Sequence, residues 1–149
     1  MVSVRIDYEN GYYVGEAFEK DGSFLENGKG RFVWLSGEIY EGDFSDGIRT
    51  GKGSFIWPNG DVYEGDFLND MRTGKGVIRW SSGDSYSGDF VDGIRTGKGT
   101  LSWSNGERYE GDFLDGNMEG HGIHYGQEGR IIYEGDWIEN CPLNKFENE

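Results

Sequence analysis

One segment of the chain has the outline of a phosphate-binding loop. In Gly47-Ile48-Arg49-Thr50-Gly51-Lys52-Gly53, glycines surround a lysine, the combination that holds nucleotide phosphates with backbone amides and an ammonium group. The segment has three residues before Gly-Lys where that motif has four, and a glycine where Ser or Thr would hold magnesium. A strand pattern follows it where the motif needs a helix. We therefore predict no nucleotide site, and the recurrence of the segment at residues 93–99 is explained by a repeat.

The histidines, the cysteine and the acidic residues are the candidates for a metal site. His121 and His124 are three residues apart, a separation that places them on opposite faces of a strand, so with Cys141 they do not form a zinc site. The acids recur in straight rows, whereas a calcium loop gathers its oxygen ligands from one curled segment. No nucleophile with a base stands out. The sequence thus predicts no metal site, no cofactor and no enzyme activity.

The elements that must position these residues are repeats. Tyr40-Glu41-Gly42-Asp43-Phe44 returns with its tyrosine at positions 63, 86 and 109, a spacing of 23 residues each time. A unit of this size forms one hairpin at most, and a hairpin buries an apolar face only when its neighbours stack beside it. The function must therefore come from an extended surface.

Composition narrows the class of protein further. The 149 residues fit one domain, and with 34% hydrophobic but 15% aromatic residues, the aromatic side chains must supply most of the burial in one elongated sheet. The formal net charge of -14 argues against nucleic acid and disfavours a membrane surface. A single cysteine, no apolar run near the ~20 residues that span a bilayer, and no signal-peptide core predict a soluble intracellular protein.

Each unit has the pattern of a β-hairpin. In residues 40–44, alternation puts the tyrosine, the glycine and the phenylalanine on one face and the acids on the other. We expect residues 46–50 to form a connection and residues 51–57 a second strand, with its phenylalanine and tryptophan on the aromatic face. Asn59-Gly60 suits a short turn to the next unit, because both residue types accept positive φ. The predicted fold class is all-β, a meander of successive hairpins.

When the units are stacked, side chains of the same type align into columns. The glycines between the aromatic residues leave room for a neighbouring ring to lie across the backbone, which would compensate for their cost in a strand. The opposite face sets rows of Asp and Glu beside Lys52, Lys75 and Lys98, in cross-strand pairs worth only ~0.2–1 kcal/mol each. Arg49, Arg72 and Arg95 form a further column, expected in the connecting loops along one edge as solvated charge or as a contact for an acidic peptide or headgroup. The aromatic columns are Trp34, Trp57, Trp80 and Trp103; Tyr40, Tyr63, Tyr86, Tyr109 and Tyr133; and Phe44, Phe67, Phe90 and Phe113.

The ends of the chain depart from the pattern. Alternating apolar residues near 2–8 predict a capping strand within residues 1–12. The array then spans residues 13–138, with units starting near 13, 40, 63, 86, 109 and 133, and the connection in the first unit is about four residues longer. Residues 139–149 are expected to form a C-terminal tail, where Pro142 would end a strand.

These features together resemble MORN repeats, the membrane occupation and recognition nexus family. The Tyr-x-Gly-x-Phe strand, the Gly-rich connection, the Gly-x-Gly second strand and the 23-residue unit carry the resemblance over residues from about 13 to 138. It implies an elongated, twisted, single-layer antiparallel meander with a curved aromatic face. It also implies binding of other proteins in cytoskeletal, ciliary and membrane-junction assemblies, since similar arrays form homodimers or hold a partner helix.

The aromatic face must serve both as core and as binding surface. A single sheet has no second layer to cover it, and a residual exposed apolar patch marks an interaction site. We expect the phenylalanines mainly to pack and the tryptophan and tyrosine columns to contact a partner. The leading hypothesis is a non-enzymatic scaffold or adaptor that holds a partner helix or peptide, apolar-faced with basic flanks, or a second copy of itself.

Two alternatives remain at this stage. One is a phospholipid or membrane adaptor, suggested by the family name and the arginine column but opposed by the net charge. The other is a regulatory subunit of an enzyme on another chain. The expected location is the cytoplasm, in association with the cytoskeleton or a cilium.

Overall fold

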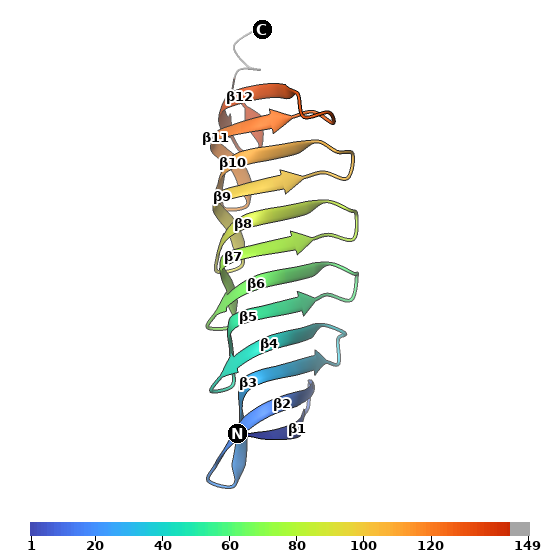
Figure 1. Ribbon diagram of the computed structural model, residues 1–149, viewed down its shortest axis with the longest axis vertical. Helices are drawn as coiled ribbons and strands as arrows, with labels where there is room; N and C mark the ends of the chain where they lie inside the picture. The colour runs from blue at the N-terminus through green and yellow to red at the C-terminus, as the bar shows by residue number, and fades with distance from the viewer. Residues whose placement is uncertain (144–149) are drawn as a thin grey trace.

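The computed structural model describes residues 1–143, and these form one antiparallel sheet of thirteen strands (Figure 1). Each strand pairs with its neighbours in the chain, so the sheet is a meander stacked into an elongated column. The predicted all-β, single-layer meander of hairpins is confirmed. The strands are β1 (Val2–Tyr8), β2 (Gly11–Lys20), β3 (Ser23–Trp34), β4 (Ile39–Ser45), β5 (Ile48–Ile56), β6 (Val62–Leu68), β7 (Met71–Arg79), β8 (Ser85–Val91), β9 (Ile94–Ser102), β10 (Arg108–Leu114), β11 (Asn117–Tyr125), β12 (Ile131–Ile138) and β13 (Cys141–Pro142).

Two kinds of turn join successive strands. Asp46-Gly47 alone closes the hairpin between β4 and β5, with φ of 50° and 79°. Positive φ at both residues is typical of a type I′ turn, whose twist matches that of the flanking strands. The predicted connection over residues 46–50 is wrong, because the strand resumes at Ile48. At the opposite end of the unit, the short turn predicted at Asn59-Gly60 forms, and the Gly60 N–H donates to the Trp57 carbonyl at 3.0 Å.

A bulge interrupts the hairpins at a recurring position. Between β4 and β5, Gly42 pairs with Gly53 but Phe44 pairs with Arg49, so Asp43 alone faces three residues of β5. A bulge bends its strand and increases the twist. The bend brings aromatic side chains from either side of it into contact. The same register shift recurs between residues 15 and 17, 65 and 67, 88 and 90, and 111 and 113.

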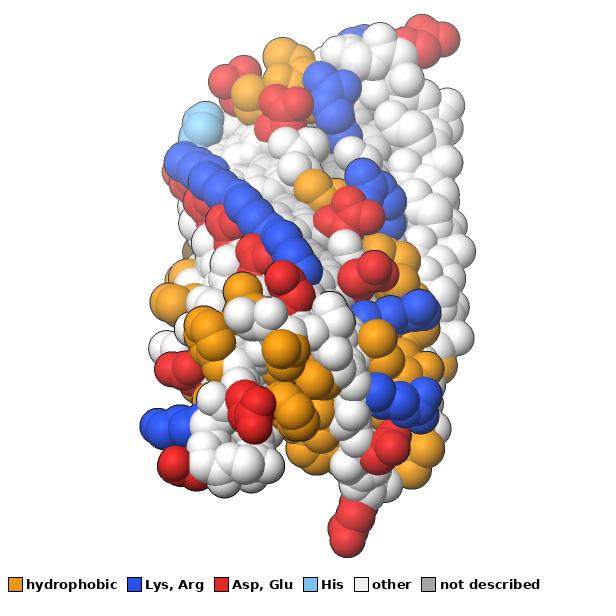
Figure 2. Space-filling view, turned by 60° about the horizontal axis from the view of Figure 1, so that its bottom comes forward, with side chains coloured by type: hydrophobic (Ala, Val, Ile, Leu, Met, Phe, Trp, Pro, Cys, Tyr) orange, Lys and Arg blue, Asp and Glu red, His pale blue; other side chains and the backbone are white. Residues whose placement is uncertain are grey.

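An acidic residue secures each of these bulges on the outer, charged face: Glu16 at the first, where it accepts the backbone N–H of Lys29 at 2.7 Å, and an aspartate at the others. The Asp66 carboxylate pairs with the Lys52 ammonium, and its Oδ2 accepts the backbone N–H of Lys75 at 2.9 Å. The predicted cross-strand charge pairs are therefore present, and Figure 2 shows a continuous row of basic side chains beside acidic ones. The backbone bond adds a contribution to stability that the sequence pattern did not predict. Asp43, Asp89 and Asp112 make equivalent contacts.

Acid should weaken this contact. The hydrogen bond from the Lys52 side chain, followed by the bond from the Lys75 N–H, lowers the pKa of Asp66. A lowered folded-state pKa gives stability that is present above the unfolded value of ~3.9 and is lost as the pH falls through the folded value. We expect Asp66→Asn to lower the free energy of unfolding by about 1 kcal/mol at neutral pH, and by less at pH ~3.

Urea denaturation at the two pH values measures this difference. Glu41→Gln is the matched control, because it makes the same charge change at an exposed position of β4 and should cost under ~0.5 kcal/mol at both. An Asp66→Asn effect that is undiminished in acid would contradict the assignment.

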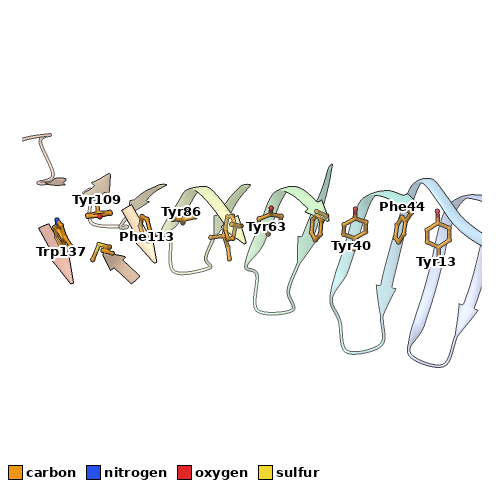
Figure 3. Close-up of a cluster of buried hydrophobic side chains, with 12 residues drawn as sticks. Tyr13, Tyr40, Phe44, Tyr63, Tyr86, Tyr109, Phe113 and Trp137 are labelled. Atoms are coloured by element: carbon orange, nitrogen blue, oxygen red, sulfur yellow. The ribbon is translucent and has the colours of Figure 1, made fainter. Parts of the chain in front are cut away.

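The core is a file of aromatic rings to which Ile78 and Met118 add aliphatic side chains (Figure 3). Tyr63 meets Phe67 of its own unit and Phe90 of the next, with ring centroids 5.3 and 5.1 Å apart and the planes nearly perpendicular. This edge-to-face geometry is favoured by the ring quadrupoles. The Tyr63 ring lies over Gly76 of the neighbouring strand, and its hydroxyl donates to the Asp66 carbonyl at 2.7 Å. The glycine that leaves room for the ring is therefore on the neighbouring strand; at Gly65, a glycine predicted to have this role, a Cβ would first meet the backbone of Lys75 and Gly76, both at 2.5 Å.

The buried phenols should resist ionisation. Burial raises the pKa of Tyr63 to about 12, and Tyr86 and Tyr109 behave alike. Because the folded-state pKa is raised, the stability is full below the unfolded value of ~10 and is lost as the pH rises towards the folded one. We expect a tyrosinate absorbance phase near pH 12 that coincides with loss of the β-sheet circular dichroism signal. In the Tyr63→Phe variant, the absorbance change of this phase should fall by the amount expected for one phenol. A decrease in the absorbance change at lower pH would contradict the burial of Tyr63.

The ends of the array are also built from hairpins. The extra residues of the first unit lengthen β2 and β3 around Asp21-Gly22, so the longer connection predicted there is wrong. The strand predicted near residues 2–8 is β1. Cys141–Pro142 forms β13 against β12, so the predicted tail starts as a strand, while its residues 144–149 lie outside the described residues.

Candidate binding groove

A row of half-buried tryptophans runs along the aromatic face beside the core. The Trp57 ring packs on Phe55 with centroids 4.8 Å apart, and Phe55 contacts Trp34 of the preceding unit at 5.5 Å. These side chains lie at the strand ends that are farther from the bulges, and each keeps part of its surface exposed. The row consists of Trp34, Trp57, Trp80 and Trp103.

The tyrosines lie deeper than the sequence indicated. Tyr40, Tyr63, Tyr86 and Tyr109 are 0% exposed, whereas Phe44 keeps 7%. The expectation that tyrosine is more accessible than phenylalanine is therefore wrong, because alternation assigns a side chain to a face and not to a depth. Of the predicted tyrosines, Tyr133 alone keeps exposed surface. The other tyrosines belong to the core cluster against which the tryptophans pack.

The arginines lie on the aromatic face and not in loops along an edge. The Arg72 guanidinium carbon is 5.3 Å from the Trp57 ring centroid, 5.6 Å from that of Tyr63 and 5.7 Å from that of Phe90. Such cation–π contacts contribute ~0.5–1 kcal/mol at exposed sites and more when desolvated. The predicted edge position is wrong because each hairpin closes within two residues, which returns Arg49, Arg72 and Arg95 to strands β5, β7 and β9.

The three arginines differ in their polar contacts. Arg49 Nε lies 3.2 Å from the Asp70 carboxylate. The Arg49 Nη2 also donates to the Asp70 carbonyl at 3.1 Å. Arg72 and Arg95 make the equivalent bond from Nη2 to the carbonyls of Gly93 and Gly116, at 2.9 and 2.8 Å, where the glycines offer no carboxylate. Burial lowers the pKa of both of these guanidinium groups.

Three depressions that share lining residues adjoin one another on this surface. One of about 420 Å³ is lined by Trp57, Pro58 and Arg72, and one of about 480 Å³ by Trp80 and Trp103. A third, of about 270 Å³, is lined by Arg72 and Arg95. We call this surface the groove and define it by Trp57, Trp80, Trp103, Arg72 and Arg95.

One rim of the groove is acidic. Asp61 lines both of the larger depressions, and Asp84 lines the second. Their carboxylates accept the backbone N–H groups of Ser81 and Ser104, each at 2.8 Å, which fixes them at the turns. A basic side chain of a partner would meet these carboxylates.

The tryptophan row stops at Trp103. Gly126 occupies the next equivalent position, and the Arg108 guanidinium carbon lies 3.9 Å from the centroid of the adjacent Tyr125 ring. A separate depression of about 380 Å³ there is lined by Glu107, Glu128 and Arg130 among others. The groove therefore does not continue unchanged to the C-terminal end.

The candidate metal-binding residues are dispersed. His124 Nε2 lies 2.7 Å from the Glu107 carboxylate, His121 Nδ1 lies 3.8 Å from Asp136, and Cys141 is exposed. Within residues 1–143, no three or more His, Cys, Asp or Glu side chains are grouped to hold a metal ion. In that part of the chain, no helix has the length and apolar character needed to cross a membrane.

The sequence interpretation missed an exposed aliphatic stripe beside the two-residue turns. Leu68 faces Met71 across one turn and Val91 faces Ile94 across the next, and all four side chains are between 43% and 53% exposed. The signal was present as apolar residues on both sides of each turn. It was hidden because residues 46–50 and their equivalents were assigned to loops.

Comparison with known proteins identifies the family of the chain. No curated protein matches it. Among solved structures, one of the Drosophila melanogaster SAS-4 (dCPAP) TCP domain in complex with a proline-rich motif of Ana2 (dSTIL) is similar, at 13% identity and a TM-score of 0.39, covering 91% of this chain and 90% of that chain. The model of the MORN repeat matches four consecutive segments, residues 40–62, 63–85, 86–108 and 109–129. Each segment starts at a core tyrosine, and together they cover more than half of the sequence, so the chain belongs to the MORN repeat family.

Proposed function

We propose that this protein is a non-enzymatic scaffold or adaptor whose groove holds a segment of a partner protein. MORN repeats are generally repeat scaffolds, which supports the class of function. The observation that carries the proposal is the row of half-buried tryptophans, because large aromatic side chains that stay partly exposed in a rigid sheet are typical anchors of binding surfaces.

The groove favours a partner segment with a defined arrangement of apolar and charged residues. Its floor is aromatic and takes an apolar face of a helix or peptide. Its rim carries Asp61 and Asp84, which favour basic residues flanking that apolar face. The resulting partner is an apolar-faced segment with basic flanks.

Paired substitutions on opposite faces test this function. Affinity capture from source cells compares the wild type with Trp57→Ala/Trp80→Ala and with the control Leu68→Ala/Val91→Ala, which removes exposed apolar surface outside the groove. We expect the tryptophan variant to lose its partners at least about tenfold, as expected for anchors worth ~1.4 kcal/mol or more, while the control keeps them. Full capture by a folded tryptophan variant would contradict the proposal.

Self-association is a second use of the same array. β1 has a sheet neighbour on one side only, and an open edge pairs readily with another strand. Light scattering over a concentration series distinguishes a monomer from a dimer. The proposed setting is a cytoplasmic assembly of the cytoskeleton, a cilium or a membrane contact.

A further inference from the structure

We propose that Arg72 and Arg95 form an anion pocket in the groove that takes one carboxylate side chain of an apolar peptide segment. This inference rests on the proposed function and adds the chemistry of the partner at one position. It concerns the depression of about 270 Å³ between the two arginines.

The pocket combines apolar walls with two cations. Ile78, Trp80, Phe90 and Ile94 line it together with the two arginines, and its lining, drawn from the described part of the chain, contains no Asp or Glu. Low-polarity walls strengthen an ion pair formed inside them. The pocket is thus suited to a single negative group carried by an apolar segment.

The two guanidinium groups have N–H donors to spare for a ligand. Each donates from Nη2 to one carbonyl, that of Gly93 for Arg72 and that of Gly116 for Arg95, and within residues 1–143 neither forms an ion pair. A guanidinium carries five N–H donors, so several remain on each. A half-buried cation without a counter-charge is costly, and an incoming carboxylate relieves that cost.

A sequence difference at the turns produces this pair. Arg49 reaches the second residue of the following two-residue turn, which is Asp70, and is neutralised there. The corresponding residues opposite Arg72 and Arg95 are Gly93 and Gly116. The same fold therefore contains one neutralised arginine as an internal control beside two that form no ion pair within residues 1–143.

The repeat geometry favours an extended peptide as the occupant. One unit is two strands wide, about 9.6 Å, which three residues of a polyproline II chain span at ~3.1 Å each. This extended chain has three residues per turn, so residues three apart lie on the same side of it. Apolar residues three apart would then enter the depressions beside Trp57 and Trp103, with an acidic residue between them over the arginines. The formal net charge of -14 opposes an anionic membrane as the source of the negative group.

Titration of the full chain with matched peptides tests the pocket. The probe is a capped peptide with the core Leu-Pro-Glu-Leu-Pro, whose prolines favour an extended chain, and the control carries Gln in place of Glu. NMR follows the side-chain resonances of Arg72, Arg95 and Trp80. We expect all three to shift, with the Gln peptide binding about five- to tenfold more weakly and the difference shrinking in high salt.

Variants assign the effect to the arginines. Arg72→Gln and Arg95→Gln should each abolish most of the preference for Glu, whereas Arg49→Gln should keep it. Circular dichroism reports whether each variant folds, and the Glu-to-Gln comparison on the wild type stands without any variant.

The outcomes separate the pocket from the groove. Equal binding of both peptides, lost in Trp57→Ala/Trp80→Ala, would overturn the pocket and leave the groove. No shift with either peptide at millimolar concentration would also overturn the pocket, while the groove is judged by the capture experiment. Equal shifts by inorganic phosphate alone would overturn a peptide carboxylate as the occupant.

Discussion

Gly76→Ala should lower the free energy of unfolding by about 3 kcal/mol or more, the upper end of the range for overpacked cores. A Cβ at residue 76 would lie 2.5 Å from the Tyr63 hydroxyl oxygen and 2.6 Å from Cζ. Tyr63 has nowhere to move, because it is fully buried, bonded to the Asp66 carbonyl and held between Phe67 and Phe90. Urea denaturation of the purified variant measures the loss.

A second glycine serves as the control. At residue 126 a Cβ would meet its nearest atom, the Ile132 Cδ1, at an ordinary 3.4 Å. Neither Gly76 nor Gly126 has a left-handed φ, so the two substitutions differ in the room available for a Cβ and not in backbone strain. Gly126→Ala should change stability by under ~0.5 kcal/mol or raise it slightly.

A double-mutant cycle identifies the cause of the loss. In a Tyr63→Ala background the ring is gone, so Gly76→Ala should cost much less than in the wild type, with a coupling of at least ~1 kcal/mol. Equal costs in both backgrounds would contradict a clash with the Tyr63 ring.

Phe90→Ala should cost about 3–5 kcal/mol, as in other large-to-small core substitutions. Phe90 is 2% exposed and meets both Tyr63 and Tyr86 edge to face, with centroids 5.1 Å apart in each case. Its loss leaves a gap in a file of rings that no second layer can fill. Denaturation monitored by circular dichroism measures the effect.

The next residue in the chain gives the matched comparison for this prediction. Val91 points to the outer face and is 50% exposed, so Val91→Ala should cost under ~0.5 kcal/mol. A Phe90→Ala cost as small as that of Val91→Ala would mean that the ring file contributes little to stability. Phe90 also lines the pocket at Arg72, so peptide binding should weaken in a Phe90→Ala protein that remains folded.

Because the tyrosines are buried, they belong with the phenylalanines to the core and not to the binding surface. The Tyr and Phe rings stabilise the array through contacts between successive units, as expected for a protein whose units contact only their neighbours. The tryptophans and arginines, farther from the bulge, remain for recognition. Stability and binding can therefore be altered separately at most of these positions, with Phe90 as the exception because it belongs both to the core and to the lining of the pocket.

Much of the fold could be predicted from periodicity. The 23-residue spacing predicted stacked hairpins, because a unit so short cannot bury an apolar face alone. Alternation placed the tyrosines and phenylalanines together on one face and the Asp–Lys pairs on the other, since side chains of a strand point alternately to its two sides. These rules are local, so the sequence alone was enough to apply them.

The tertiary structure decided how deeply each aromatic side chain is buried and on which face the arginines lie. Three residues of one strand face one of the next, and this bulge determines that Tyr63 is buried while Trp57 stays half exposed. The turn at Asp46-Gly47 closes within two residues, which returns Arg49 and its equivalents to the aromatic face. Neither outcome follows from alternation, because both depend on how two strands register across a bend. The sequence by itself determined the repeat, the family and the two faces; the register across the bulge decided which residues of the aromatic face form the core and which form the groove.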